Sequence, residues 1–109
     1  MHEILKRPSE ENKRAIIEAL LIWDVDYTHR SNVYEYLWKH DRNFYETKMP
    51  YGRFIQLMKT LVGEGFLEYP TKLMGSGTVR TSEKGREFLK ELGNAIQLNK
   101  YRIDLQLIP

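Results

Sequence analysis

The amino-acid sequence predicts a mainly α-helical domain with one small β-hairpin, in the order helix, helix, helix, hairpin, helix. Four segments carry apolar residues at helical spacing. Two short β-like runs flank a glycine-rich turn. The chain has 109 residues, 41% of them hydrophobic, which is enough for one compact domain and too few for two.

The first helix is expected to run from Ser9 to Trp23. Ser9 is a good N-cap, because its hydroxyl can accept a hydrogen bond from an unpaired N–H of the first turn. Ile16, Leu20 and Trp23 then fall on one face. Beside them lie further apolar residues, Ile17, Leu21 and Ile22. A helix with so wide an apolar face is either sandwiched inside the domain or half-exposed until a partner covers it.

The second and third helices are expected to follow two polar connections. Residues 24–31 are predicted to be the first connection, and Asn32 is predicted to cap the second helix, with Glu35 in capping-box position. The third helix is predicted to start at Met49–Pro50, where proline fits the first turn. Its buried face would be Phe54, Leu57, Met58 and Leu61. Gly63 and Gly65 are expected to end it, because glycine adopts the left-handed cap conformation without strain.

The hairpin is predicted from the runs Phe66–Tyr69 and Thr78–Thr81, with Pro70–Gly77 between them as a loose tip. Ser82 is expected to cap the last helix, which would continue to about Leu98. These boundaries divide the chain into an N-terminal extension (1–8), the domain itself (9–92) and a C-terminal tail (93–109).

The tail allows two predictions. Leu89, Leu92, Ile96 and Ile103 keep a heptad-like spacing, which favours a helical coiled-coil arm. Polar residues alternate with apolar ones from Lys100 onwards, and this favours a strand. We favour a helix followed by an extended segment, with the tail as a dimerisation element.

Composition excludes several classes of function. The chain has no cysteine, which removes disulfides, thiolate metal sites and cysteine nucleophiles, and fits a cytoplasmic protein. Its longest apolar run, Ala19 to Trp23, is too short to cross a membrane. Asp24, Asp26 and His29 match no known metal-ligand spacing, and loop aspartates beside helices are usually caps. No catalytic arrangement, cofactor motif or small-molecule site stands out, so we expect neither an enzyme nor a metal protein.

Charge is unevenly distributed although the net charge is only +2. Residues 1–54 contain nine basic and nine acidic residues. Residues 48–90 carry a surplus of four positive charges, from Lys48, Arg53, Lys59, Lys72, Arg80, Lys84, Arg86 and Lys90 against Glu64, Glu68, Glu83 and Glu87. A local surplus of this kind can guide a polyanion to one surface.

Two segments resemble a known family. The segment YGRFIQLMKTLVGEGFL, residues 51–67, is similar to a recognition helix and the entry to a wing. The segment TSEKGREFLKEL, residues 81–92, resembles the element that starts the last helix of winged-helix regulators of the PadR and MarR kinds, and of small archaeal winged-helix dimers. The resemblance implies a winged helix-turn-helix fold. The segment from His40 to Met49 departs from it, because the turn of such a motif usually has three or four residues. Either the docking geometry differs or the second helix continues past His40.

The resemblance also implies a double-stranded DNA-binding protein, acting as a homodimeric transcriptional regulator. With Phe54, Met58 and Leu61 inward, the outward residues would approach the major groove, and the wing would lie beside the flanking backbone. The predicted DNA-binding residues are Tyr51, Gly52, Arg53, Gln56, Lys59, Lys72 and Arg80. Arginine and glutamine suit base edges, whereas lysine suits phosphates.

Another prediction stays open beside this one. The weak net charge is also compatible with a winged helix that contacts another protein and binds no DNA. The dense group of aromatics in residues 27–45 is expected to be core around the second helix. If Tyr34 and Trp38 are exposed, they are expected to form a partner surface.

Overall fold

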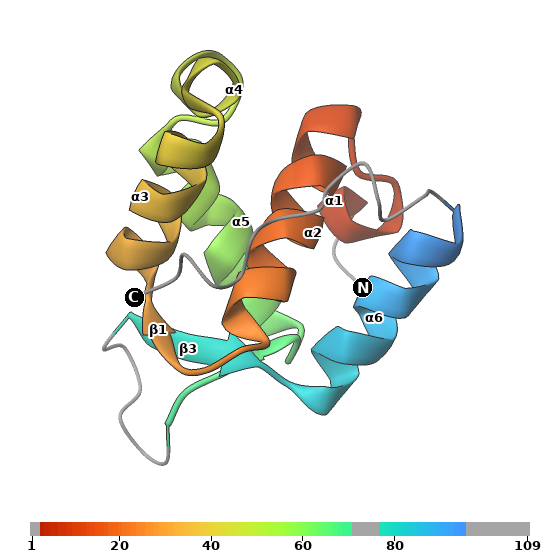
Figure 1. The fold of residues 1–109 in the computed structure, drawn as a ribbon. Helices are drawn as coiled ribbons and strands as arrows, with labels where there is room; N and C mark the ends of the chain where they lie inside the picture. The colour runs from red at the N-terminus through yellow and green to blue at the C-terminus, as the bar shows by residue number, and fades with distance from the viewer. Residues whose placement is uncertain (1–2, 71–76, 96–109) are drawn as a thin grey trace.

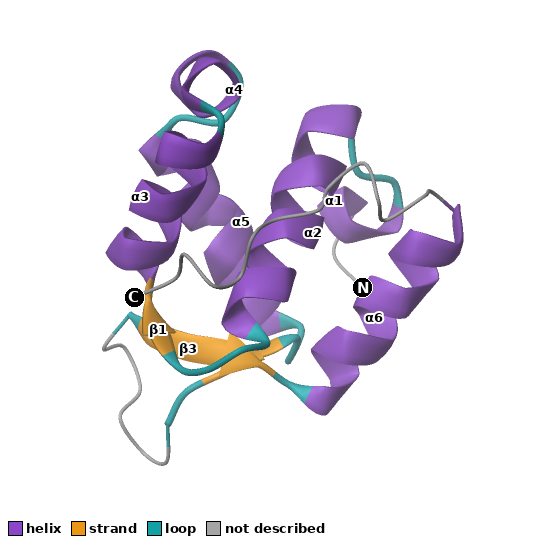
Figure 2. Ribbon diagram, in the orientation of Figure 1, coloured by secondary structure: helices purple, strands orange, loops and turns teal. Residues whose placement is uncertain are grey.

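A computed structural model describes residues 3–70 and 77–95 of the chain. They form a mainly helical globule with a small antiparallel sheet at one end (Figures 1 and 2). The elements in chain order are α1 (Glu3–Lys6), α2 (Glu10–Trp23), β1 (Thr28–His29), α3 (Arg30–His40), α4 (Arg42–Thr47), α5 (Tyr51–Gly63), β2 (Leu67–Glu68), β3 (Thr78–Thr81) and α6 (Glu83–Ala95).

The sheet has three strands in the order β1–β3–β2, and both pairs are antiparallel. Strand β3 is central because Val79 pairs with Thr28 on one side while Thr81 pairs with Leu67 on the other. The sequence predicts that residues 24–31 form a polar connection. This prediction is wrong in part, because the segment contains strand β1 and the start of α3. The indole of Trp23 supports the start of this strand, since its N–H donates to the carbonyl of Thr28 at 2.9 Å.

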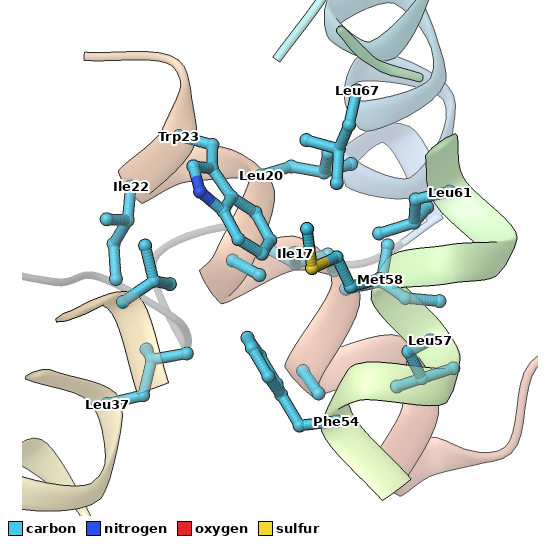
Figure 3. Close-up of a cluster of buried hydrophobic side chains, with 14 of the residues drawn as sticks. Ile17, Leu20, Ile22, Trp23, Leu37, Phe54, Leu57, Met58, Leu61 and Leu67 are labelled. Atoms are coloured by element: carbon cyan, nitrogen blue, oxygen red, sulfur yellow. The ribbon is translucent and has the colours of Figure 1, made fainter. Parts of the chain in front are cut away.

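Helix α2 lies at the centre of the molecule, with α3 on one side and α6 on the other (Figure 1). Its wide apolar face is therefore covered inside a single chain. Ile17, Leu20 and Ile22 are fully buried, and Trp23 stacks on Phe54 of α5 at 5.9 Å between ring centres. Figure 3 shows this cluster, which also contains the other predicted inward residues of α5, Leu57, Met58 and Leu61.

Three helix caps predicted from the sequence are confirmed. Ser9 accepts from the N–H of Asn12, and Ser82 accepts from the N–H of Gly85. Gly65 has φ +80°, and the N–H of Phe66 reaches back to the carbonyl of Leu61 in a Schellman arrangement. Gly63, which the sequence predicts as a second glycine cap, is the last residue of α5 and does not have a positive φ. Among the described glycines, only Gly65 and Gly77 have a positive φ.

The connections between the helices are more structured than expected. Helix α3 begins at Arg30, and its N-cap is His29, whose Nδ1 accepts from the N–H of Ser31. The prediction of Asn32 as the cap is wrong, because pairing in β1 brings the chain into the helix three residues earlier. The long segment after His40 contains α4, so α3 does not continue, and Asp41 caps the new helix by accepting from Phe44.

Helix α1 lies within the predicted N-terminal extension, and its Leu5 is only 2% exposed in the core. The hairpin strands match the prediction at Thr78–Thr81, whereas β2 is restricted to Leu67–Glu68. The hairpin tip (71–76) and the tail from residue 96, with both predictions for its structure, lie outside the described residues.

Candidate nucleic-acid interface

Helix α5 separates an apolar inner face from a polar outer face. Phe54 and its inward neighbours are at most 5% exposed, whereas Gly52, Gln56 and Lys59 are exposed. Successive residues of an α-helix turn by about 100°, which places Gly52 opposite the core-facing residues, with Gln56 on one side of it and Lys59 on the other. The outer face is thus open to a ligand along the length of the helix.

The flank of α5 that carries Lys59 borders a pocket of about 350 Å³. Its walls come from α5, from the start of α3 and from the two sides of the hairpin. The lining residues are Arg30, Tyr51, Ile55, Met58, Lys59, Tyr69 and Gly77. Two of the predicted DNA-binding residues, Tyr51 and Lys59, therefore meet here.

Two unopposed cations belong to this pocket. No carboxylate is among its described lining residues. Within residues 3–70 and 77–95, neither Arg30 nor Lys59 forms an ion pair, whereas Arg14, Lys39 and Arg86 each do. An unpaired cation beside apolar walls attracts an anion more strongly than one that an acidic neighbour neutralises. The pocket is therefore suited to a negatively charged group.

The pocket wall at Tyr51 is supported by partly buried contacts of Tyr34. The Tyr51 ring stands edge-on to the Tyr34 ring, at 5.1 Å between centres. The Tyr34 hydroxyl lies 2.9 Å from the carbonyl oxygen of Tyr45 and 3.0 Å from that of Met49. Burial, with a smaller contribution from Glu46, raises the pKa of Tyr34, so its hydroxyl remains a donor. Tyr34 thus contacts the start of α5 and the segment before it, and these contacts leave the Tyr34 side chain only partly exposed.

Arg53 lies on the opposite flank of α5 and faces α2. Its guanidinium donates to the carbonyl of Lys48 at 2.6 Å and to Oδ1 of Asn12 at 2.9 Å. The nearby Glu11 carboxyl has a lowered pKa, mainly through a hydrogen bond to its own backbone and to a smaller extent through Lys48 and Arg53. Arg53 and Lys59 therefore lie on different sides of α5, although the sequence predicts that both contact DNA.

The two predicted wing residues are not part of the pocket in the described chain. Arg80 lies on β3, half-buried, with its guanidinium 5.3 Å from the centre of the Tyr27 ring. Its buried Nε has no hydrogen-bond partner among the described residues. Lys72 is in the hairpin tip, outside the described residues.

Sequence reasoning missed Arg30, Ile55 and Tyr69 as members of one site. The sequence pattern predicts Arg30 in a polar connection and Tyr69 at the end of a strand. They meet because β1 pairs with β3, so the N–H of Arg30 donates to the carbonyl of Gly77 at 2.9 Å. No local pattern in the sequence reveals a contact of this range.

Residues 3–70 and 77–95 contain no group of three or more acidic or histidine side chains arranged to hold a metal ion. No helix in these ranges has the length and apolar character that crossing a bilayer requires.

Comparisons of the chain with protein-family models, with curated proteins and with solved structures find no match.

Proposed function

We propose that the chain is a winged-helix domain that binds double-stranded DNA, with α5 in the major groove and the hairpin beside the backbone. The observation that carries the proposal is the polar outer face of α5, flanked by two cations without carboxylate partners in the described chain. A helix that enters the major groove needs an exposed polar side and cations placed for phosphates.

The order of elements supports the same proposal. A strand between the first two long helices pairs with the return strand of the hairpin, and this places the hairpin next to the start of α3 and α5. A hairpin in this position lies at the side of a helix docked in the groove, where it can reach the adjacent backbone. The short helix α4 lengthens the connection between α3 and α5 without disturbing this relation.

Within the predicted DNA surface the residues take different roles. Gly52 faces outward at the centre of the docked side, where it permits close approach, and the exposed Gln56 beside it is the candidate for reading a base edge. Lys59 and Arg30 are candidates for phosphate contacts. Arg53 would have to leave Asn12 and Lys48 to reach a base, so we assign it mainly to positioning α5.

The test is fluorescence anisotropy with labelled duplex DNA at about 50 mM and about 200 mM salt. Wild type should bind and lose affinity as salt rises. Lys59→Ala should weaken binding to all sequences alike and reduce the slope of log K against log salt by about 1. Gln56→Ala should instead reduce the discrimination between sequences, by about 1–3 kcal/mol at one position.

Lys90→Ala is the matched control, because Lys90 is exposed on α6, across α2 from α3. It removes the same charge from another surface and should change neither affinity nor slope. No binding of duplex DNA by wild type at low salt would contradict the proposal. Equal effects of Lys59→Ala and Lys90→Ala would move the DNA surface away from α5.

A further inference from the structure

The pocket beside α5 has features that are not needed for contacts with the phosphates of a DNA backbone. It has an apolar base formed by Ile55 and Met58, aromatic side chains in Tyr51 and Tyr69, and cations in Arg30 and Lys59. Its volume of about 350 Å³ lies within the range of small-ligand sites, about 300–1,000 Å³. A phosphate alone would use the cations and leave the apolar and aromatic walls without a partner.

The walls of the pocket are held by contacts within the chain. Tyr51 is supported by Tyr34, as described above. On the opposite side, Gly77 adopts φ +83°, and any Cβ there would collide with the guanidinium of Arg30 and with Nε2 of His29. The absence of a side chain at Gly77 thus lets the hairpin pack directly on the Arg30 guanidinium. A preformed site binds more tightly than one that must first be ordered.

These features together match the chemistry of a nucleotide, which joins a planar aromatic base to an anionic phosphate. Bases stack on aromatic side chains regardless of sequence, and arginine or lysine holds the phosphate. We propose that this pocket binds a single nucleotide, with its base against Ile55 and Met58 and between the two tyrosines, and its phosphate at Arg30 and Lys59.

Such a nucleotide has two sources, a free nucleoside monophosphate or an unpaired nucleotide of a strand bound at α5. The inference rests on the proposed function in one respect, since the second source assumes that nucleic acid lies on this face. Because Lys59 belongs both to the pocket and to the proposed DNA surface, a nucleotide in the pocket should also compete with duplex DNA.

Isothermal titration calorimetry with the full chain tests the inference. The titrants are inorganic phosphate, thymidine, thymidine 5′-monophosphate and single-stranded oligothymidine. The monophosphate should bind at least about tenfold more tightly than phosphate or thymidine, since it alone engages both halves of the pocket. Tyr69→Ala should weaken it by about 5- to 150-fold, the range equivalent to loss of one base–aromatic stack.

Charge and folding are controlled separately. Lys59→Glu should abolish monophosphate binding, whereas Lys90→Glu makes the same charge reversal on α6 and should leave it unchanged. Far-UV circular dichroism and the melting temperature identify any variant that fails to fold. For Tyr69, the conservative Tyr69→Phe should retain most of the affinity, because stacking needs the ring and not the hydroxyl.

The outcomes separate this inference from the proposed function. If phosphate binds as tightly as the monophosphate, or if no nucleotide binds while duplex DNA does, the inference is overturned and DNA binding stands. If the monophosphate binds and duplex DNA does not, the inference holds and the DNA proposal fails. Competition of oligothymidine with the monophosphate supports a strand as the source; absence of competition supports a free nucleotide.

Discussion

Glu18 is a charged residue in the middle of the hydrophobic core, only 1% exposed, and its partners explain how it is accommodated. The Tyr45 hydroxyl donates to one carboxylate oxygen at 2.7 Å, and Nε of Arg14 donates to the other at 2.9 Å. Arg14 continues to Asp41 at 2.6 Å, and Asp41 caps α4. Burial and the Glu18 charge raise the pKa of Tyr45, so it remains a hydrogen-bond donor. One network thus joins α2 to α4, and a buried charge requires such pairing.

The carboxyl of Asp41 should make stability depend on pH. The hydrogen bond from Arg14 lowers its pKa in the folded chain. Its ionised form therefore stabilises the fold above the unfolded-state pKa, about 3.9, and that contribution is lost as pH falls through the folded-state value. Asp41→Asn keeps an acceptor for the α4 cap and removes the charge, so it should destabilise at neutral pH. Urea unfolding at stepped pH should show the difference from wild type shrinking below about pH 4.

Asp26→Asn is the control for that measurement. Asp26 is exposed, and among the described residues its carboxylate accepts only from the neighbouring Tyr27 N–H and pairs with no cation. Its replacement should leave the acid dependence close to that of wild type. Parallel loss of stability by wild type and Asp41→Asn down to pH 2 would contradict the role of the Arg14–Asp41 pair.

The junction between the sheet and α6 shows why one short sequence element forms a fixed connection. The Thr81 hydroxyl donates to the carbonyl of Leu20 in α2 at 2.7 Å. Ser82 caps α6 and also donates from its hydroxyl to the carbonyl of Gly65 at 2.6 Å. Lys84 reaches the carbonyl of Glu64 at the end of α5 at 2.8 Å. The element TSEKG therefore joins α2, α5 and α6 through its own side chains.

Gly85 in the first turn of α6 should not tolerate a side chain. A Cβ there would collide with the backbone carbonyl of Phe66 and lie 2.9 Å from Cγ2 of Thr81. Gly85→Ala should therefore destabilise the fold by about 1–3 kcal/mol, as overpacking does, despite the better helix propensity of alanine. Chemical denaturation of the purified variant measures this change.

Gly63→Ala is the matched substitution at a helical glycine with open space. Nothing lies within 4 Å of a Cβ built at Gly63. It should stabilise the fold by about 0.5–1 kcal/mol, since it removes backbone entropy from the unfolded chain. If both substitutions changed the free energy of unfolding in the same direction, the close approach of α6 to Phe66 would not be what excludes a side chain at Gly85.

At the scale of the whole molecule, α1 belongs to the packed core. Leu5 is 2% exposed, whereas Lys6 beside it is exposed. Leu5→Ala should cost about 2–5 kcal/mol because it leaves a cavity. Lys6→Ala, the control in the same short helix, should change stability by less than about 0.5 kcal/mol. Thermal unfolding of both variants checks this, and equal melting temperatures would mean that α1 is dispensable.

The homodimer remains a prediction, and one of the two features that support it no longer does so. The wide apolar face of α2 is covered by other elements of the same protomer. The remaining support for a homodimer is the apolar residues of the tail (93–109), most of which lies outside the described residues. We expect light scattering to give a dimer for the full chain and a monomer for a chain ending at Leu92. Monomers in both cases at micromolar concentration would rule the dimer out.

Local sequence patterns are sufficient to predict the long helices α2 and α5, the central strand β3 and the caps at Ser9, Gly65 and Ser82. Each of these depends on interactions within a few residues, namely apolar periodicity, a side chain bonded to the nearby backbone, or a glycine at positive φ. The same patterns also place Tyr51 and Lys59 on a candidate surface, because the inward face of α5 is unambiguous.

By contrast, β1, α4, the burial of Leu5 and the pocket depend on how distant parts of the chain pack together. A strand of two residues has no periodicity of its own, and it exists because its hydrogen-bond partners come from β3, far along the chain. The same pairing brings Arg30 to Lys59, and contact with α2 turns Arg53 away from them. Contacts between residues far apart in the chain thus determine which charged side chains lie on the same surface. The local sequence does not reveal these contacts, because they depend on how the whole chain packs.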